Sequence, residues 1–276
     1  MPVVAVLWGL ALLTAVSVSL LWSASTSYSL AHDSLEIAGI NATVEAGVNR
    51  AVAALFDARP ERRWRVDGTP QTFEFDGVPI KVSIQDELGK VDINQADQSL
   101  LSNLLQSAGL DADAANNLAD KIVDWRAAAP LKRLNGAKDR DYQAAGLAIE
   151  PRNGAFQSVD ELRLVMDMTP ALFQKIEPAL TVYSGRPTFD AQVAPCEALQ
   201  ALPGMTSQNA EATVTARSSQ HLGDGSGGDG LTVLHGRAFT IRAAFERDRR
   251  LIVYDVAVRL TEDPNQPYWV LNWKAR

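Results

Sequence analysis

The strongest hydrophobic pattern lies at the start of the chain. The run from Val3 to Trp22 contains only apolar residues with Gly, Ser and Thr, and no Asp, Glu, Lys or Arg precedes Asp33. About 20 such residues span the hydrocarbon core of a bilayer as a helix, and a helix satisfies its own backbone hydrogen bonds there. The pattern therefore predicts one membrane-spanning helix near the N-terminus.

The helical pattern continues beyond the apolar run, because no proline interrupts the sequence between Tyr28 and Arg59. Apolar residues recur there at the steps of one helical face. These residues are Ile37, Val44, Val48, Val52 and Leu55. Pro60 disfavours helical backbone at Arg59, so we predict one helix of roughly 55 residues, about 80 Å long, that ends near Arg59. A secretory signal peptide is the alternative, but it would need a basic start and a shorter apolar core.

Alternation of apolar and polar residues predicts strands in two separate regions. Residues 63–87 are typical of two short strands joined at Asp76-Gly77, a dipeptide that favours tight turns. Ala238–Phe245 and Leu251–Leu260 predict a second hairpin, and a last strand is expected near Tyr268. Strands therefore stand on both sides of the central part of the chain.

The central residues 90–184 change to helical spacing, and Ser158 followed by Glu161 predicts a helix start of the capping-box type. Two helical segments with a turn at Gly109 and at Gly204 resemble helix-hairpin-helix units, which in some proteins bind DNA phosphates. Acidic residues follow both turns here, so a packing role is favoured over DNA binding.

The order of these elements predicts an α+β fold, in which a long N-terminal helix and an antiparallel sheet are interrupted by a large all-α insertion with helix-hairpin-helix-like units. The long helix covers residues 1–59. The body is formed by residues 60–89 and 218–276, and the inserted domain by residues 90–217. Residues 218–230 are rich in Gly, Ser and Asp and are typical of a flexible loop.

Composition excludes several functions. The net charge of −7 argues against a surface that binds nucleic acid or anionic lipid. Cys196 is the only cysteine, so neither an intrachain disulfide nor a cysteine zinc site can form. The three histidines, His32, His221 and His235, are scattered and indicate no ligand cluster. Because no nucleophile elbow, HExxH motif or supported pair of acids occurs, the sequence does not favour an enzyme.

Short motifs follow one another along nearly the whole chain in a characteristic order. They are Ala5–Leu13, Glu87–Asn94, Ile122–Trp125, Asn135–Asp139 with Tyr142, Ser158–Leu162, Leu180–Val182, Ala194–Leu202 and Tyr268–Trp273. Each motif is modest alone, but together they make the chain resemble the minor pseudopilin K family of the type II secretion system.

The resemblance implies a pilin-like α/β body split by an all-α insertion, and no enzymatic activity. It implies a single-pass protein of the bacterial inner membrane with a periplasmic C-terminal domain, at the tip of the pseudopilus. There it would support pseudopilus assembly and the export of folded proteins across the outer membrane. The implied partners are the I- and J-type minor pseudopilins and the inner-membrane platform of the secretion machine, with no nucleic acid. The alternative is a membrane-anchored helix-hairpin-helix DNA-binding receptor, which the acidic balance disfavours.

Two family features concern the start of the chain. Pseudopilins are cleaved after a glycine by prepilin peptidase and then N-methylated, but no basic leader with such a glycine precedes Val3. Either the start codon lies upstream of Met1 or the leader is absent. Most pilins carry a glutamate near the start of the apolar helix that pairs with a neighbour's N-terminal amine. Pseudopilin K lacks it, as this chain does before Asp33, which suits a subunit with no partner ahead of it at a tip.

The family's helical domain binds calcium, so the resemblance also implies a metal site. The candidate ligands are Asp124, Asp139 and Asp141. Where the family has further acids, this chain has Arg126 and Lys138, although calcium prefers several carboxylate or carbonyl oxygens. Two expectations follow: a weak calcium site in which the three aspartates converge, or loss of the metal with Lys138 or Arg140 supplying the charge.

Overall fold

The computed structural model describes residues 2–57, 59, 62–219 and 234–276. The loop predicted at 218–230 lies outside the described residues from position 220 onward, and so does Pro60. The chain divides into two units, Met1–Gly47 and Val48–Arg276.

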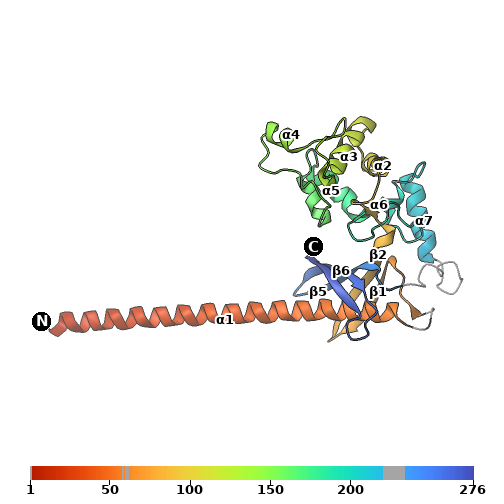
Figure 1. Cartoon of the computed structure of the whole chain (residues 1–276). Helices are drawn as coiled ribbons and strands as arrows, with labels where there is room; N and C mark the ends of the chain where they lie inside the picture. The colour runs from red at the N-terminus through yellow and green to blue at the C-terminus, as the bar shows by residue number, and fades with distance from the viewer. Residues whose placement is uncertain (1, 58, 60–61, 220–233) are drawn as a thin grey trace. The chain divides into compact units, whose positions relative to one another are not determined.

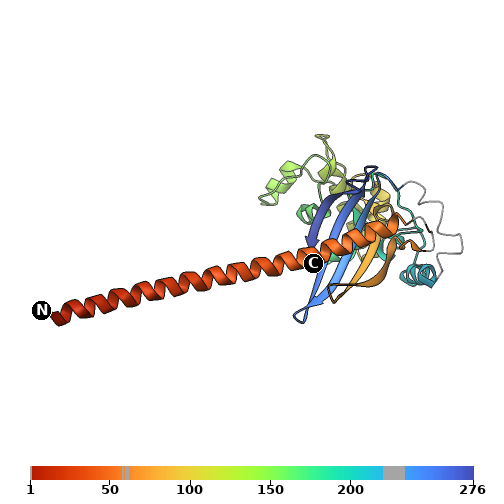
Figure 2. The same ribbon diagram turned by 90° about the horizontal axis from the view of Figure 1, so that it is seen from below.

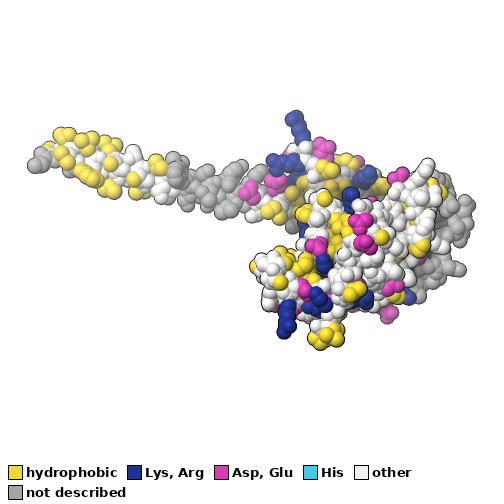
Figure 3. Space-filling model, turned by 90° about the horizontal axis from the view of Figure 1, so that it is seen from above, with side chains coloured by type: hydrophobic (Ala, Val, Ile, Leu, Met, Phe, Trp, Pro, Cys, Tyr) yellow, Lys and Arg dark blue, Asp and Glu magenta, His cyan; other side chains and the backbone are white. Residues whose placement is uncertain are grey.

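The N-terminal helix α1 (Pro2–Leu55) is continuous over 54 residues (Figure 1). Within the described chain, Pro2–Ser19 is the one stretch long and apolar enough to cross a membrane by length and composition. Ser17 Oγ donates to the carbonyl of Leu13 at 2.8 Å, so this hydroxyl is satisfied inside the helix. Figure 3 shows hydrophobic side chains along this end of α1. The predicted apolar N-terminal helix is therefore confirmed.

The helix ends at Leu55, four residues before the predicted end at Arg59. The cause is local, because the carboxylate of Asp57 accepts hydrogen bonds from the backbone N and Nε of Arg59 at 3.0 and 3.1 Å. These bonds lower the pKa of Asp57 to about 2. Short acidic side chains that bind nearby backbone amides compete with helical hydrogen bonding, and here Asp57 makes such a bond two residues after the last helical residue.

Beyond α1, the described chain forms a five-stranded antiparallel sheet in the order β1-β2-β5-β6-β7. The strands are β1 (Asp67–Phe75), β2 (Val78–Asp86), β5 (Ala238–Arg247), β6 (Arg250–Leu260) and β7 (Tyr268–Ala275). Both predicted hairpins form. Asp76 and Gly77 join β1 to β2 with φ of 51° and 73°, and Asp248 and Arg249 join β5 to β6 with φ of 50° and 62°. Two consecutive positive φ angles are typical of type I′ turns, whose twist matches that of the flanking strands.

Strands β2 and β5 are neighbours in the sheet, with Asp86 paired to Phe239, although residues 87–237 lie between them in the chain. The described part of this segment is largely helical. Its elements are η2 (Glu87–Gly89), β3 (Val91–Asp92), α2 (Gln98–Ser107), α3 (Ala112–Arg126), α4 (Asp139–Ala144), η3 (Val159–Leu164), α5 (Pro170–Ile176), η4 (Glu177–Ala179), β4 (Leu180–Thr181), α6 (Cys196–Leu199) and α7 (Ser207–Ser219). Helix, antiparallel sheet and further helices confirm the α+β class, while the predicted domain boundaries stay a prediction.

The described chain from Val48 onward contains a core between the last turns of α1 and one face of the sheet (Figure 2). Its buried residues include Val48, Ala51, Val52 and Leu55 of α1 and Ile80, Val82, Ile84, Phe239, Ile241, Ala243, Phe245, Val256 and Val258 of the sheet. The sheet residues named here alternate along β2, β5 and β6, as side chains on one face of a sheet do. Tyr268 Oη donates to Asn49 Oδ1 at 2.9 Å and ties β7 to the helix.

The helical segment has a core of its own. The ring of Trp125 stacks on Phe156 with centroids 6.1 Å apart and an interplanar angle of 12°. Tyr142 packs against the same indole at 5.9 Å. Stacked and tilted rings of this kind add to the apolar burial that stabilises a core, so this aromatic group holds the end of α3 against the loops that follow it.

The predicted capping box at Ser158 and Glu161 is wrong. Residues 159–164 form a 3₁₀ helix, and the Ser158 side chain makes no capping hydrogen bond. Glu161 is instead buried, where it accepts a hydrogen bond from Trp125 Nε1 at 2.9 Å and pairs with Arg152. Burial alone would raise the pKa of Glu161, but Arg152 and the other donors hold it below its ordinary value. The carboxylate serves the helical core because it finds stronger donors there than at a helix end.

Candidate functional site

The first predicted metal ligand, Asp124, lies in the last turn of α3 and is 2 % exposed. Its Oδ2 accepts a hydrogen bond from the backbone N of Arg133 at 2.9 Å. Gly136 lies so close that a Cβ there would be 1.8 Å from the same oxygen. Burial raises the pKa of Asp124 above its ordinary value, although the Arg133 amide acts in the opposite direction. This carboxylate therefore fastens the loop that follows α3.

The other two predicted ligands, Asp139 and Asp141, lie in the first turn of α4. Asp141 Oδ2 accepts a hydrogen bond from the backbone N of Lys138 at 2.9 Å, and its Oδ1 pairs with Lys132 Nζ at 2.6 Å. The hydrogen bond from Lys132 lowers the pKa of Asp141. Asp139 Oδ1 accepts from Asn153 Nδ2 at 3.0 Å. Both acids are thus bound to neighbouring donors.

The side chain of Lys138 lies at the centre of this region. Its Nζ donates to the backbone carbonyls of Asp124 and Ala127 at 2.6 and 2.5 Å, and to Asn153 Oδ1 at 2.8 Å. We call Lys138 with these three oxygen-bearing residues the Lys138 junction. Through it, the three predicted aspartates are linked by one lysine and one asparagine.

The oxygen atoms of the Lys138 junction, as they are arranged, do not form a calcium site. Calcium takes six to eight oxygen ligands, whereas a positively charged amine already faces these oxygens and would repel a cation. Within the described residues, no group of three or more His, Cys, Asp or Glu side chains is arranged to hold a metal ion. Arg140, the other residue expected to supply charge, is exposed. Calcium binding by the chain stays a prediction.

Asn153 was not identified from the sequence as a functional residue, although the dipeptide Asn153-Gly154 favours a turn. Its φ is 52°, a left-handed conformation that asparagine tolerates better than most residues. This backbone turns the side-chain amide towards both Lys138 and Asp139. An asparagine followed by a glycine was the only sequence signal for it.

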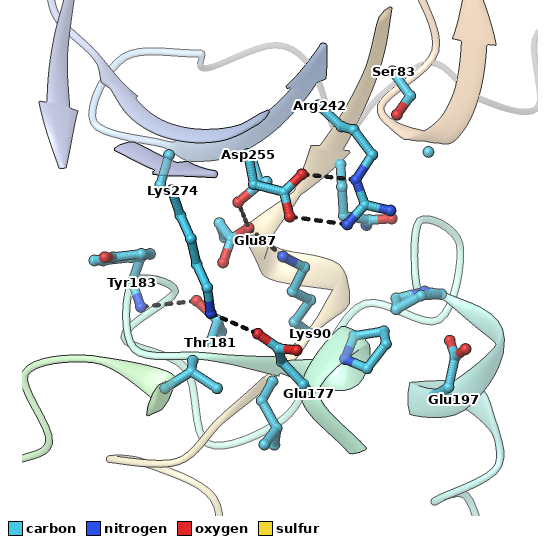
Figure 4. Close-up of a pocket in the computed structure, with 18 of the residues that line it drawn as sticks. Ser83, Glu87, Lys90, Glu177, Thr181, Tyr183, Glu197, Arg242, Asp255 and Lys274 are labelled. Atoms are coloured by element: carbon cyan, nitrogen blue, oxygen red, sulfur yellow. Dashed lines mark hydrogen bonds and ion pairs between the residues drawn. The ribbon is translucent and has the colours of Figure 1, made fainter. Parts of the chain in front are cut away.

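A second polar site is a cavity of about 410 Å³ between the sheet and the helical segment (Figure 4). We call six of the charged residues that line it, which pair with one another, the charged cleft. They are Asp160, Glu177, Arg242, Asp255, Lys274 and Arg276. Arg242 on β5 binds Asp255 on β6 through two parallel hydrogen bonds of 2.7 and 2.9 Å. Such two-pronged pairing gives both strength and a fixed geometry.

The remaining contacts of the charged cleft join the C-terminal residues Lys274 and Arg276 to β6 and to the helical segment. Arg276 donates to Asp255 at 2.7 Å and to Glu177 at 2.6 Å. Lys274 Nζ lies 2.9 Å from the same Glu177 and 2.7 Å from Asp160. Each of these charges is paired with another member of the cleft, so the arrangement suits a structural joint rather than a site that reacts with a substrate.

Asp255 is a buried carboxylate of the cleft that pairs with two arginines. Its side chain is 8 % exposed, and burial alone would raise the pKa of its carboxyl. The hydrogen bonds and charge of Arg242, followed by those of Arg276, outweigh burial and hold the pKa below its ordinary value. Asp255 is therefore expected to stay ionised through the physiological pH range.

The first hairpin unit does not present a phosphate site. Gly109 has a φ of 109°, which allows the tight turn between α2 and α3. The N-terminus of α3 is then closed by Asp111, whose side chain accepts a hydrogen bond from the backbone N of Ala114 at 2.8 Å. Helix N-termini attract phosphate, but a carboxylate occupies this one and Asp113 adds a further negative charge. The geometry favours helix packing.

Comparison with known proteins gives two findings. Residues 82–185 match the family described as type II secretion system (T2SS), protein K. The structure is similar to a chain of the GspK-GspI-GspJ complex from the type 2 secretion system of enterotoxigenic Escherichia coli, with a TM-score of 0.61, covering 89 % of this chain and 98 % of that chain. The sequence identity is 17 %, so this likeness concerns the fold. A search of curated proteins gave no match.

The family match covers most of the motifs on which the resemblance was based, from Glu87–Asn94 to Leu180–Val182. The pilin-like arrangement of a long apolar helix and an antiparallel sheet agrees with it. The recognition made from the sequence is therefore confirmed: residues 82–185 carry the domain described as type II secretion system (T2SS), protein K.

Proposed function

We propose that this protein is a minor pseudopilin at the tip of the type II secretion pseudopilus, where it supports pseudopilus assembly and the export of folded proteins across the outer membrane. The observation that carries the proposal is the protein K match at residues 82–185, in a chain whose long apolar helix precedes a pilin-like sheet. The chain acts in this role as a building block and not as an enzyme.

The proposed location is the bacterial inner membrane, crossed once, with the folded body in the periplasm. The apolar stretch at the start of α1 supports the membrane anchor. A charge at mid-membrane depth would be costly, and the sequence has no Asp, Glu, Lys or Arg before Asp33. The proposed tip position rests on the protein K match, because the resemblance to that family implies it.

The proposed partners are the I- and J-type minor pseudopilins and the inner-membrane platform. The similar solved chain comes from a complex that contains GspI and GspJ. In the sheet of this chain, β7 is an edge strand that exposes Trp269 and Val270 by 57 % and 49 %. Edge strands carry unpaired backbone groups that can bind another chain, and exposed apolar side chains favour association. This edge supports docking of another pilin-like subunit.

The direct test is co-purification of the full chain, in detergent, with I- and J-type minor pseudopilins from the same organism. We expect a ternary complex, and we expect the chain to restore secretion in a strain that lacks its gene. Trp269→Ser should weaken the complex without lowering the melting temperature. Leu251→Ser is the matched control, because Leu251 is 73 % exposed on β6. A folded chain that binds neither partner would contradict the proposal.

A gel-shift experiment with double-stranded DNA at low salt tests the alternative function, that of a membrane-anchored DNA-binding receptor. Low salt is the most sensitive condition, because phosphate contacts are strongest there. We still expect no binding, because acidic residues follow the first hairpin turn. Submicromolar binding that weakens steeply as salt is added would instead favour a DNA-binding receptor.

A further inference from the structure

The Lys138 junction has the features of an occupied cation site. One ammonium group faces two backbone carbonyls and one amide oxygen at 2.5 to 2.8 Å. A lysine ammonium has three donors and no acceptor, so the three oxygens match its hydrogen-bonding capacity. Because the carbonyls of Asp124 and Ala127 lie at the C-terminal end of α3, the negative end of the helix dipole, they favour a positive charge.

The surrounding contacts hold these oxygens in position. Asn153 receives the amine on its Oδ1 and donates its Nδ2 to Asp139, so its amide is fixed from both sides. The backbone N of Lys138 is bound by Asp141. On the other side of the loop, Asp124 binds the backbone of Arg133. The amine therefore joins the end of α3, the start of α4 and the turn at Asn153.

We propose that Lys138 is the resident cation of this junction: its covalently attached amine takes the place that a divalent metal ion would occupy, and it orders residues 127–137 without calcium. The residues around it contribute oxygens of the kind that calcium also prefers. Replacing the amine by a carboxylate should therefore turn the same junction into a calcium-dependent one. The inference concerns this loop and is independent of where the protein acts.

The first experiment compares melting of the full chain in detergent, followed by tryptophan fluorescence, in millimolar calcium and in chelator. The wild-type melting temperature should be the same in both. Lys138→Met should lower it by about 3–6 °C in both conditions, since the freed oxygens lose their donor. Lys132→Met is the matched control: it removes an equal charge from the same loop, at a side chain that is 46 % exposed, and should change melting little.

The second experiment uses Lys138→Glu with calcium as the probe. In chelator this variant should melt below the wild type, and millimolar calcium should raise its melting temperature by several degrees through mass action. Hydrogen exchange of residues 127–137 should slow on adding calcium in this variant and stay unchanged in the wild type. This readout localises the effect to the loop.

Three outcomes would overturn the proposal. One is a wild-type chain that binds calcium stoichiometrically and melts higher with it, with Lys138→Met retaining that binding. Another is a Lys138→Met variant that melts like Lys132→Met. The third is a folded Lys138→Glu variant that ignores calcium. Should Lys138→Glu fail to fold, calcium binding to the wild type and the comparison of the two methionine variants still decide the matter.

Discussion

The Lys138 junction and the charged cleft both connect parts of the chain that are distant in sequence, but they do so with different chemistry. In the junction, one amine is shared by neutral oxygens of the backbone and of an amide. In the cleft, three cationic side chains share three carboxylates. Because the oxygens of the junction are neutral and held in fixed positions, its stability is expected to depend on how closely the surrounding atoms fit. Because the side chains of the cleft are charged and partly exposed to solvent, the stability of the cleft is expected to depend on pH and salt.

The largest effect is expected at Gly89, where the backbone of η2 packs directly against the backbone of Val193. A Cβ at this position would lie 2.5 Å from the carbonyl oxygen of Val193 and 2.7 Å from its carbonyl carbon. Because backbone cannot move aside as a side chain can, Gly89→Ala should cost about 3 kcal/mol of unfolding free energy. Gly154→Ala is the control, with no neighbouring atom nearer than 3.7 Å. Urea denaturation of both variants measures the difference, and equal midpoints would refute the clash.

The next effect tests the shape of the Lys138 junction through Gly136→Ala. The new Cβ would displace the Asp124 carboxylate, which is a side chain and can partly yield. We therefore expect a smaller cost, about 2 kcal/mol, that does not change between low and high salt. A salt-dependent loss would show that charge, and not fit, dominates this junction. The same urea experiment at two salt concentrations provides the measurement.

A third prediction concerns Asp255 and the pH dependence of the cleft. The folded pKa of this carboxyl lies below its ordinary value, so the stabilisation is present above the unfolded pKa of about 3.9 and is lost as pH falls through the folded pKa. Asp255→Asn should cost about 1–2 kcal/mol near pH 7. The gap between wild type and variant should shrink below pH 4. A constant gap from pH 7 to pH 3 would contradict the ion-pair explanation.

The smallest effect is expected from Lys274→Met, at the solvent side of the cleft. Its ammonium pairs with Asp160, which is 42 % exposed, as well as with Glu177. Pairs of this kind contribute less than about 1 kcal/mol and are screened by salt. The cost should therefore vanish in about 0.5 M sodium chloride, where the Debye length is only a few ångströms. A cost that persists in salt would mean that the methylene stem, and not the charge, matters.

The sequence predicts the parts of this fold that depend on local rules. A run without charges specifies the apolar helix, and Asp76-Gly77 supplies the residues that a type I′ turn needs. The pair of Arg242 and Asp255 also belongs to this class, because they face each other across the second hairpin, as opposite charges on neighbouring strands often do. Drawing the register of that hairpin would have found the pair from sequence.

Other features lie beyond such rules. Glu177 meets Lys274 and Arg276 only because the sheet and the helical segment pack together, and no spacing in the sequence encodes that meeting. Glu161 resembled a capping residue, but a buried indole proved the stronger partner. Lys138 and Arg140 were equal candidates by charge. The backbone at the start of α4 decides between them, since only Lys138 reaches the end of α3.

The pairing of β2 with β5 also determines the order in which the body can form. For an unstructured segment as long as residues 87–237, closing the loop would cost roughly 4 kcal/mol in chain entropy. The helical segment reduces that cost if it forms first, because the backbone N of Asp190 bonds to the carbonyl of Leu88 at 2.8 Å and brings distant positions together. Three of the five strands, β5, β6 and β7, lie at or beyond Ala238. The helical segment can thus form before the C-terminal strands emerge during synthesis, whereas the sheet is complete only after they have emerged.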